Sequence, residues 1–89
     1  MNIAEQLNQI VKDFNQIALD RMGDPTREEA LAAHNAIVEI REANTEEIRN
    51  AFLGEWFDGS EGDKLMQADM NATELSHRIV RTWSGAFTA

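Results

Sequence analysis

Apolar residues recur every three or four positions along most of the chain, which is the spacing of one face of an α-helix and not of a strand. The first series predicts a helix over about residues 3–22. Gly23 follows it, and glycine readily takes the left-handed conformation in which many helices end, so we expect the helix to stop there. The five regularly spaced residues, here called the N-terminal seam, are Ile3, Leu7, Ile10, Phe14 and Ile17.

A second helix is expected over about residues 25–43, and its start carries two signals. Asp24 stands before Pro25, which fits an N-cap followed by proline at the first helical position. Thr26 has Glu29 three residues later, which fits a capping box. Five residues then share one face of this helix, namely Ala30, Leu31, His34, Ile37 and Val38.

A third helix is expected over about residues 45–57, because Asn44 and Glu47 also have the spacing of a capping box. The alternative is a single continuous helix from about residue 26 to residue 57, since neither proline nor glycine occurs between residues 42 and 48. We favour the break at Asn44.

The last helix is expected over about residues 63–84, after a polar run that contains two glycines. Its core face is formed by Leu65, Ala68, Ala72, Leu75, Ile79 and Trp83. Because no segment has the alternating pattern of a strand, the predicted fold is all-α. We expect a small antiparallel helical bundle of three or four helices, which forms a single domain over residues 1–89.

The charge of the chain changes the picture, because it is unevenly distributed. The 89 residues include 16 acidic and 8 basic ones, for a net charge of −8. Residues 24–63 hold eleven of the acidic and three of the basic residues, so this segment alone accounts for the net charge. Such a field attracts basic partners and repels nucleic-acid backbones, so we expect a partner with a basic surface and no direct binding of nucleic acid.

The absence of cysteine excludes disulfides and thiolate zinc sites, so the domain must be held together by apolar packing alone or by packing against a partner. No stretch approaches the ~20 consecutive apolar residues of a membrane span, and the first residues lack the pattern of a secretory signal. We therefore expect no membrane contact and a cytoplasmic location, in the host cytosol or in a virion if a phage encodes the chain.

Two patterns that suggest a metal site are incomplete. Asp58, Ser60 and Asp69 occupy positions 1, 3 and 12 of an EF-hand-like frame, but Asp63 stands where the sharp turn requires glycine. Glu74 and His77 have the Glu-x-x-His spacing of helical di-iron proteins. The second pair that such a site needs is missing, because Leu31 stands three residues before His34. We expect no metal and no cofactor.

Catalytic and nucleic-acid-binding patterns are equally weak. Ser76 and His77 are adjacent and so point to different sides of a helix, and no other serine and histidine are close in the sequence. Arg78 and Arg81, near Trp83, form a small basic and aromatic group. Their positions suit the negative end of the helix dipole better than they suit nucleic acid. We therefore predict that the chain is not an enzyme.

The strongest functional signal is a predicted contact region between residues 52 and 63, in which aromatic and acidic residues alternate. Aromatic side chains anchor many protein interfaces, and carboxylates around them orient a basic partner. Phe52 and Trp56 share a helix face, whereas Phe57 is rotated by about 100° from Trp56, so one small core cannot easily bury all three. The region consists of Phe52, Glu55, Trp56, Phe57, Asp58, Glu61 and Asp63.

We therefore expect a non-catalytic protein-binding module, an inhibitor or adaptor that docks its acidic middle on a basic, nucleic-acid-binding surface of a larger protein. In composition the chain is similar to inhibitors encoded by phages and mobile elements, some of which mimic the charge of DNA. One alternative is a structural, homo-oligomeric or virion component, in which the N-terminal seam joins two copies. A second alternative is a helical metal-dependent enzyme that uses Glu74 and His77.

Overall fold

The computed structural model describes residues 2–21, 23, 25–53 and 61–83. These residues form four helices: α1 (Ile3–Arg21), α2 (Arg27–Ala43), α3 (Thr45–Leu53) and α4 (Glu61–Thr82). The prediction of an all-α bundle is confirmed. The fourth helix begins two residues earlier than predicted, and the predicted end of the third helix, at residue 57, lies outside the described residues.

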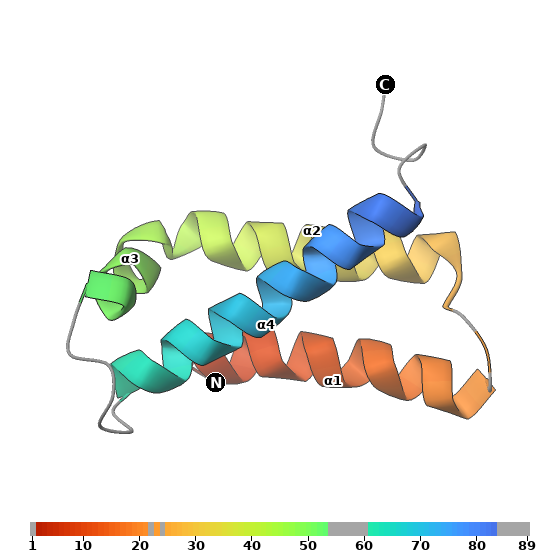
Figure 1. The fold of residues 1–89 in the computed structure, drawn as a ribbon, viewed down its shortest axis with the longest axis horizontal. Helices are drawn as coiled ribbons and strands as arrows, with labels where there is room; N and C mark the ends of the chain where they lie inside the picture. The colour runs from red at the N-terminus through yellow and green to blue at the C-terminus, as the bar shows by residue number, and fades with distance from the viewer. Residues whose placement is uncertain (1, 22, 24, 54–60, 84–89) are drawn as a thin grey trace.

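The helix α4 is the centre of the arrangement (Figure 1). Helices α1 and α2 run in opposite directions along the long axis of the molecule, and α4 crosses them obliquely. α4 contacts each of the other three helices, and its contact with α1 is the most extensive. The short α3 lies at the end of the bundle where α2 finishes and α4 begins. α4 therefore has one face in the core and one side next to α3.

The core forms where the apolar faces of α1, α2 and α4 meet. Leu7 and Phe14 of the N-terminal seam are buried there, and Ile3 and Ile10 pack against the same cluster. The seam is thus occupied by helices of its own chain. A homodimer through this seam stays a prediction, and it would have to use the parts of these side chains that remain exposed.

Small residues make up much of this core. Four of the nine buried residues in the main cluster are alanines: Ala4, Ala30, Ala68 and Ala72. Alanine lets neighbouring helix backbones approach closely, which explains how the oblique α4 can pack on two helices at once. In the part of the chain that the structure describes, the largest side chains with less than 2% of their surface exposed are Leu7, Ile37 and Ile79.

The N-terminus of α2 is closed by the capping box at Thr26, the second of the two predicted start signals. The Thr26 Oγ1 atom accepts a hydrogen bond from the Glu29 backbone N–H at 3.2 Å, and Glu29 Oε1 accepts one from the Thr26 N–H at 2.8 Å. The Glu29 carboxylate also pairs with Arg21 at the end of α1. One glutamate therefore caps α2 and ties it to α1. Asp24 lies outside the described residues.

We expect the replacement Glu29→Gln to lower the free energy of unfolding at about pH 7, and the loss to shrink in acid. The pKa of Glu29 lies below its ordinary value of 4.5, chiefly because the ionised carboxylate accepts the backbone N–H of Thr26. The stabilisation is therefore complete above about pH 4.5 and disappears as the pH falls through the lower, folded-state pKa. Urea titrations of both proteins at several pH values measure the difference.

The matched control for this experiment is Glu28→Gln, which makes the same charge change one residue earlier on the exposed side of the helix. We expect a smaller loss of stability for this control. If the difference in the free energy of unfolding between the wild type and Glu29→Gln did not change with pH, the role assigned to the ionised carboxylate would be contradicted.

Gly23 follows α1 as predicted, but the expected conformation is wrong. Its backbone N–H donates to the carbonyl of Ala18, five residues earlier, at 3.3 Å. This bond closes the C-terminal turn of many helices. The φ angle of Gly23 is not in the left-handed region, and an added Cβ would meet only the Arg21 carbonyl oxygen, at 3.9 Å. The hydrogen bond, and not the freedom of glycine, therefore closes this end.

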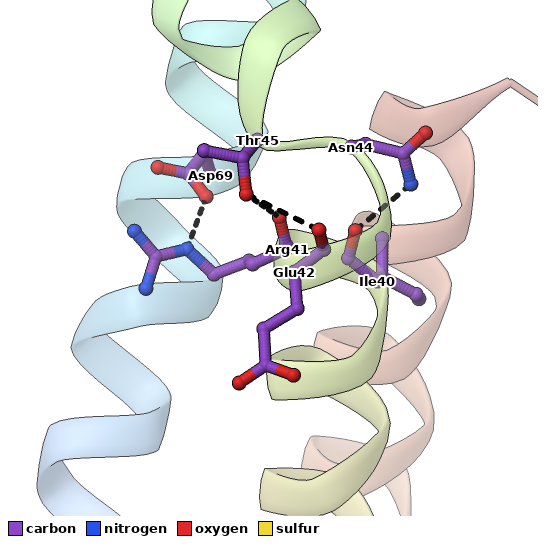
Figure 2. Close-up of polar contacts among 6 residues, drawn as sticks. All are labelled: Ile40, Arg41, Glu42, Asn44, Thr45 and Asp69. Carbon is purple, nitrogen blue, oxygen red and sulfur yellow. Dashed lines mark hydrogen bonds and ion pairs between the residues drawn. The ribbon is translucent and has the colours of Figure 1, made fainter.

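The predicted break at Asn44 is confirmed, and the alternative of one continuous helix is excluded (Figure 2). The Asn44 side chain donates from Nδ2 to the Ile40 carbonyl at 2.8 Å. The Thr45 hydroxyl donates to the carbonyls of Arg41 and Glu42, at 3.0 and 3.2 Å. These side chains satisfy carbonyl groups that the end of α2 leaves without helical partners, and this makes the break possible without proline or glycine.

The role of Asn44 differs from the predicted one. We expected its side chain to cap the beginning of the third helix together with Glu47. Its amide instead bonds back to α2, and only its backbone carbonyl, which accepts from the Ile48 N–H at 3.0 Å, contributes to α3. Asn44 therefore closes the end of one helix rather than the start of the next.

Candidate functional site

A groove of about 470 Å³ lies where α4 passes α2 and α3, and we call it the α4 groove. One residue comes from α2, one from α3 and six from α4. Those from α4 recur every three or four positions and so form one stripe on the helix. The lining residues are Arg41, Phe52, Asp69, Met70, Thr73, Glu74, His77 and Arg81.

Large apolar side chains are exposed in this groove and at the end of α3. Phe52 is 39% exposed and Met70 is 55% exposed, and both line the α4 groove. Leu53, the next residue of α3, is 75% exposed. We call these three residues the apolar patch. Large apolar groups that a chain leaves exposed together usually mark a contact with another molecule.

An ion pair between an exposed arginine and a buried aspartate forms one wall of the groove. Arg41, in the last turn of α2, donates from Nε to Asp69 Oδ1 of α4 at 2.7 Å (Figure 2). The Asp69 side chain is only 5% exposed, whereas that of Arg41 is 43% exposed. A buried carboxylate therefore fixes the inner edge of the guanidinium. Its two terminal nitrogens carry four further N–H groups beyond this bond.

Sequence reasoning missed this pair. It considered Asp69 only as a ligand of the EF-hand-like frame, whereas the structure joins Asp69 to an arginine 28 residues away. No local spacing signals such a pair, because it depends on how α2 and α4 cross.

The charge of the groove differs from that of the chain. Among the described residues that line it there are two arginines and two carboxylates, whose charges cancel, against a net charge of −8 for the whole sequence. One of the two carboxylates is buried at Asp69, which leaves Glu74 as the exposed acidic group beside Arg41 and Arg81. His77 adds a further nitrogen. On its exposed surface, the groove thus presents more hydrogen-bond donors than acceptors.

Four exposed acidic residues lie close in sequence to the joint between α2 and α3. We call this group the acidic corner; it comprises Glu39, Glu42, Glu46 and Glu47, all exposed. In Figure 1 the joint lies at the same end of the molecule as α3. α3 therefore carries glutamates of the acidic corner in its first turn and the apolar residues Phe52 and Leu53 at its end.

The predicted contact region is described only in part. Phe52 is exposed, and Asp63, in the first turn of α4, is half-buried. Glu61 begins α4, but its side chain is not described. For the other members of the region, the assignment stays a prediction. Outside the described residues lie Glu55, Trp56, Phe57 and Asp58.

Glu74 and His77, considered above as metal ligands, both line the α4 groove. Helical spacing places them on one side of α4, as the Glu-x-x-His pattern requires. Within the described residues, however, no group of three or more histidine, aspartate, glutamate or cysteine side chains is placed to hold a metal ion. The pair therefore lacks further protein ligands in that part of the chain.

The structure joins a serine to a histidine that the sequence did not connect. Ser76 Oγ of α4 lies 2.6 Å from His34 Nδ1 of α2, whereas sequence reasoning considered Ser76 only with His77. Ser76 is buried, so a substrate could reach its hydroxyl only if the helices moved apart. We therefore assign the Ser76 and His34 contact to the packing of α2 on α4.

Among the helices as far as they are described, none has both the length and the apolar character needed to cross a membrane. Comparison of the chain with protein-family models, with curated proteins and with solved structures gives no match.

Proposed function

We propose that this chain is a non-catalytic protein-binding module, a small acidic inhibitor or adaptor that docks on a basic surface of a larger protein. One observation carries the proposal: the apolar patch of Phe52, Leu53 and Met70 is exposed, and two of these residues share a nine-residue helix with part of the acidic corner. The contact surface thus lies around α3.

The patch and the acidic corner have complementary roles in this proposal. Apolar and aromatic side chains contribute most of the affinity when a partner covers them, because their burial removes apolar area from water. Carboxylates around such anchors raise the association rate with a basic partner and fix its orientation. Glu46 and Leu53 are seven residues apart, about 10 Å along the helix axis, so one partner surface can reach both.

The proposal is tested by affinity capture with the full chain from a lysate of the source organism. We expect a specifically retained protein whose recovery falls about tenfold or more when Leu53→Ser and Met70→Ser are combined, because two apolar anchors are lost. The matched control is Leu19→Ser, which alters a side chain that is 71% exposed on α1, away from α3. This control should retain the partner.

The electrostatic part of the proposal is tested in the same capture. Neutralising Glu42, Glu46 and Glu47 to glutamine should lower the recovery of the partner several-fold, because association slows, and raising the salt concentration should have the same effect. Neutralising Asp20 of α1 and Glu28, at the opposite end of α2 from Glu42, is the control; both residues are exposed. A partner that is retained equally by all variants and at all salt concentrations would overturn the proposed contact surface.

A further inference from the structure

We propose that a pocket at the other end of the molecule from α3 binds a small carboxylic acid that carries an aromatic ring. The pocket has a volume of about 310 Å³ and lies between the C-terminal halves of α1 and α4; we call it the wedge pocket. The ring of the ligand contacts the apolar floor, and its carboxylate binds Arg78. This inference goes beyond the proposed function, because the described lining of the wedge pocket includes no residue of the apolar patch or the acidic corner.

The wedge pocket forms because α1 and α4 diverge. Near their beginnings the two helices are close, since Ile3 of α1 and Leu65 of α4 line one small depression. They run in the same general direction and separate toward their C-terminal ends (Figure 1). The lining on the side of α4 extends from Leu75 to Trp83, eight residues or about 12 Å. The pocket is therefore short as well as small.

The floor of the wedge pocket is apolar and belongs to the core. Phe14, Leu75 and Ile79 line the pocket and are buried, whereas Ala18 and Trp83 are half-buried beside them. An apolar cavity of about 150 Å³ is enough to hold a benzene ring, and pockets for small molecules begin at about 300 Å³. A ring with a short side chain therefore fits this volume, and its burial removes apolar area from water.

The polar groups at the edge of the wedge pocket include hydrogen-bond donors without an acidic competitor. Arg78 and Asn15 line the pocket and are exposed. Among the described residues, no carboxylate lines the pocket or lies within ion-pair distance of Arg78. The nearby carbonyls of Arg78 and Ile79 already accept, from the Thr82 hydroxyl and the Trp83 N–H, both at 2.9 Å. The guanidinium is thus the charged group that a ligand meets.

Charge complementarity selects an anion with an apolar body. A guanidinium binds a carboxylate through two parallel hydrogen bonds, and its unoccupied donors at Arg78 differ from those of Arg41, which Asp69 already engages. An amine would meet Arg78 as a like charge, and inorganic phosphate would leave the floor without an apolar partner. The sequence after Glu74 contains two arginines and no acidic residue, so its charge is opposite in sign to the net charge of −8.

The experiment is a titration of the isotope-labelled full chain, followed by nuclear magnetic resonance at neutral pH and physiological salt. The probes are phenylpropanoate, phenylpropanamide, phenylpropylamine and inorganic phosphate. We expect phenylpropanoate to bind with a Kd of about 1 mM and about tenfold more tightly than the amide, because its hydrogen bonds to arginine are charge-assisted. The amine and phosphate should bind least. The signals that move should belong to residues 14–18 and 75–83, and not to α3.

Two pairs of variants locate the two parts of the ligand. Arg78→Gln should reduce the affinity for phenylpropanoate to that for the amide. Arg81→Gln removes the same charge one turn later, but Arg81 lines the α4 groove, so this control should bind like the wild type. Ala18→Met should fill the pocket and abolish binding of both aromatic probes, whereas Ala32→Met, at an exposed position of α2, should not. Circular dichroism confirms that each variant is folded, which we expect for Arg78→Gln because Arg78 is exposed.

Four results would overturn this inference: no binding of phenylpropanoate at about 10 mM, binding of the amide, the amine or phosphate at least as tight as that of the acid, equal behaviour of Arg78→Gln and Arg81→Gln, or equal behaviour of Ala18→Met and Ala32→Met. Each of them leaves the proposed function standing, because capture of a partner through the apolar patch and the acidic corner is measured separately.

Discussion

Replacement of Leu7 by alanine is expected to lower the free energy of unfolding by about 2–5 kcal/mol, because it removes a large side chain from a closely packed core. Leu7 is fully buried in the cluster that joins α1 to α4 and α2. The total free energy of unfolding of a domain of 89 residues is typically about 5–13 kcal/mol, so this loss would be a large share of it. Urea unfolding followed by circular dichroism at several protein concentrations measures it.

The control is Leu19→Ala on the same helix. Leu19 is 71% exposed, so the same chemical change should alter the stability by less than about 0.5 kcal/mol. Equal effects of the two replacements would show that α1 does not pack through the face described above. A stability that rises steeply with protein concentration would instead favour the homo-oligomeric alternative.

Replacement of Arg41 by alanine is expected to lower the free energy of unfolding by about 2–3 kcal/mol. Asp69 is 5% exposed, and without Arg41 its carboxylate would remain buried with no cationic partner. Loss of one member of a fully buried pair costs about 3–5 kcal/mol, and we expect less here because Arg41 is 43% exposed and solvent screens its charge. Unfolding in urea at neutral pH gives the value.

A double-mutant cycle separates the ion pair from other effects of the change. Asp69→Ala in the Arg41→Ala background should recover part of the lost stability, because it removes the unpaired charge. Arg49→Ala, an exposed arginine of α3, is the control and should cost less than about 0.5 kcal/mol. If the two side chains did not interact, the costs of Arg41→Ala and Asp69→Ala would simply add. A double variant whose loss of stability equals the sum of the two single losses would therefore contradict the ion pair.

The features that sequence reasoning predicted well are local ones. The capping box of Thr26 and Glu29 involves residues three apart, and the core face of α4 repeats every three or four residues, so both follow from helical geometry alone. The joint at Asn44 was less certain from the sequence, because nothing there forbids a helix. Hydrogen bonds from the Asn44 and Thr45 side chains to the carbonyls of α2 stabilise the break.

The features that sequence reasoning missed depend on how helices cross. Asp69 meets Arg41 across 28 residues, and Ser76 meets His34 across 42 residues. Periodicity shows which face of a helix is apolar, but it does not fix which residues of two crossing helices come together. The exposure of Leu53 and Met70 was missed for the same reason, because it depends on which parts of α3 and α4 pack against each other.

The alanine-rich core has a consequence for the life of the protein in a cell. Alanines bury little apolar area, so a core that includes Ala4, Ala30, Ala68 and Ala72 contributes only a modest driving force for folding. A partner present at about a hundred times its Kd would add about 2.7 kcal/mol to the free energy of unfolding, which is a large increase for a domain of small total stability. If the chain binds a partner as proposed, proteases would remove uncomplexed copies first, and the abundance of the chain would follow that of the partner.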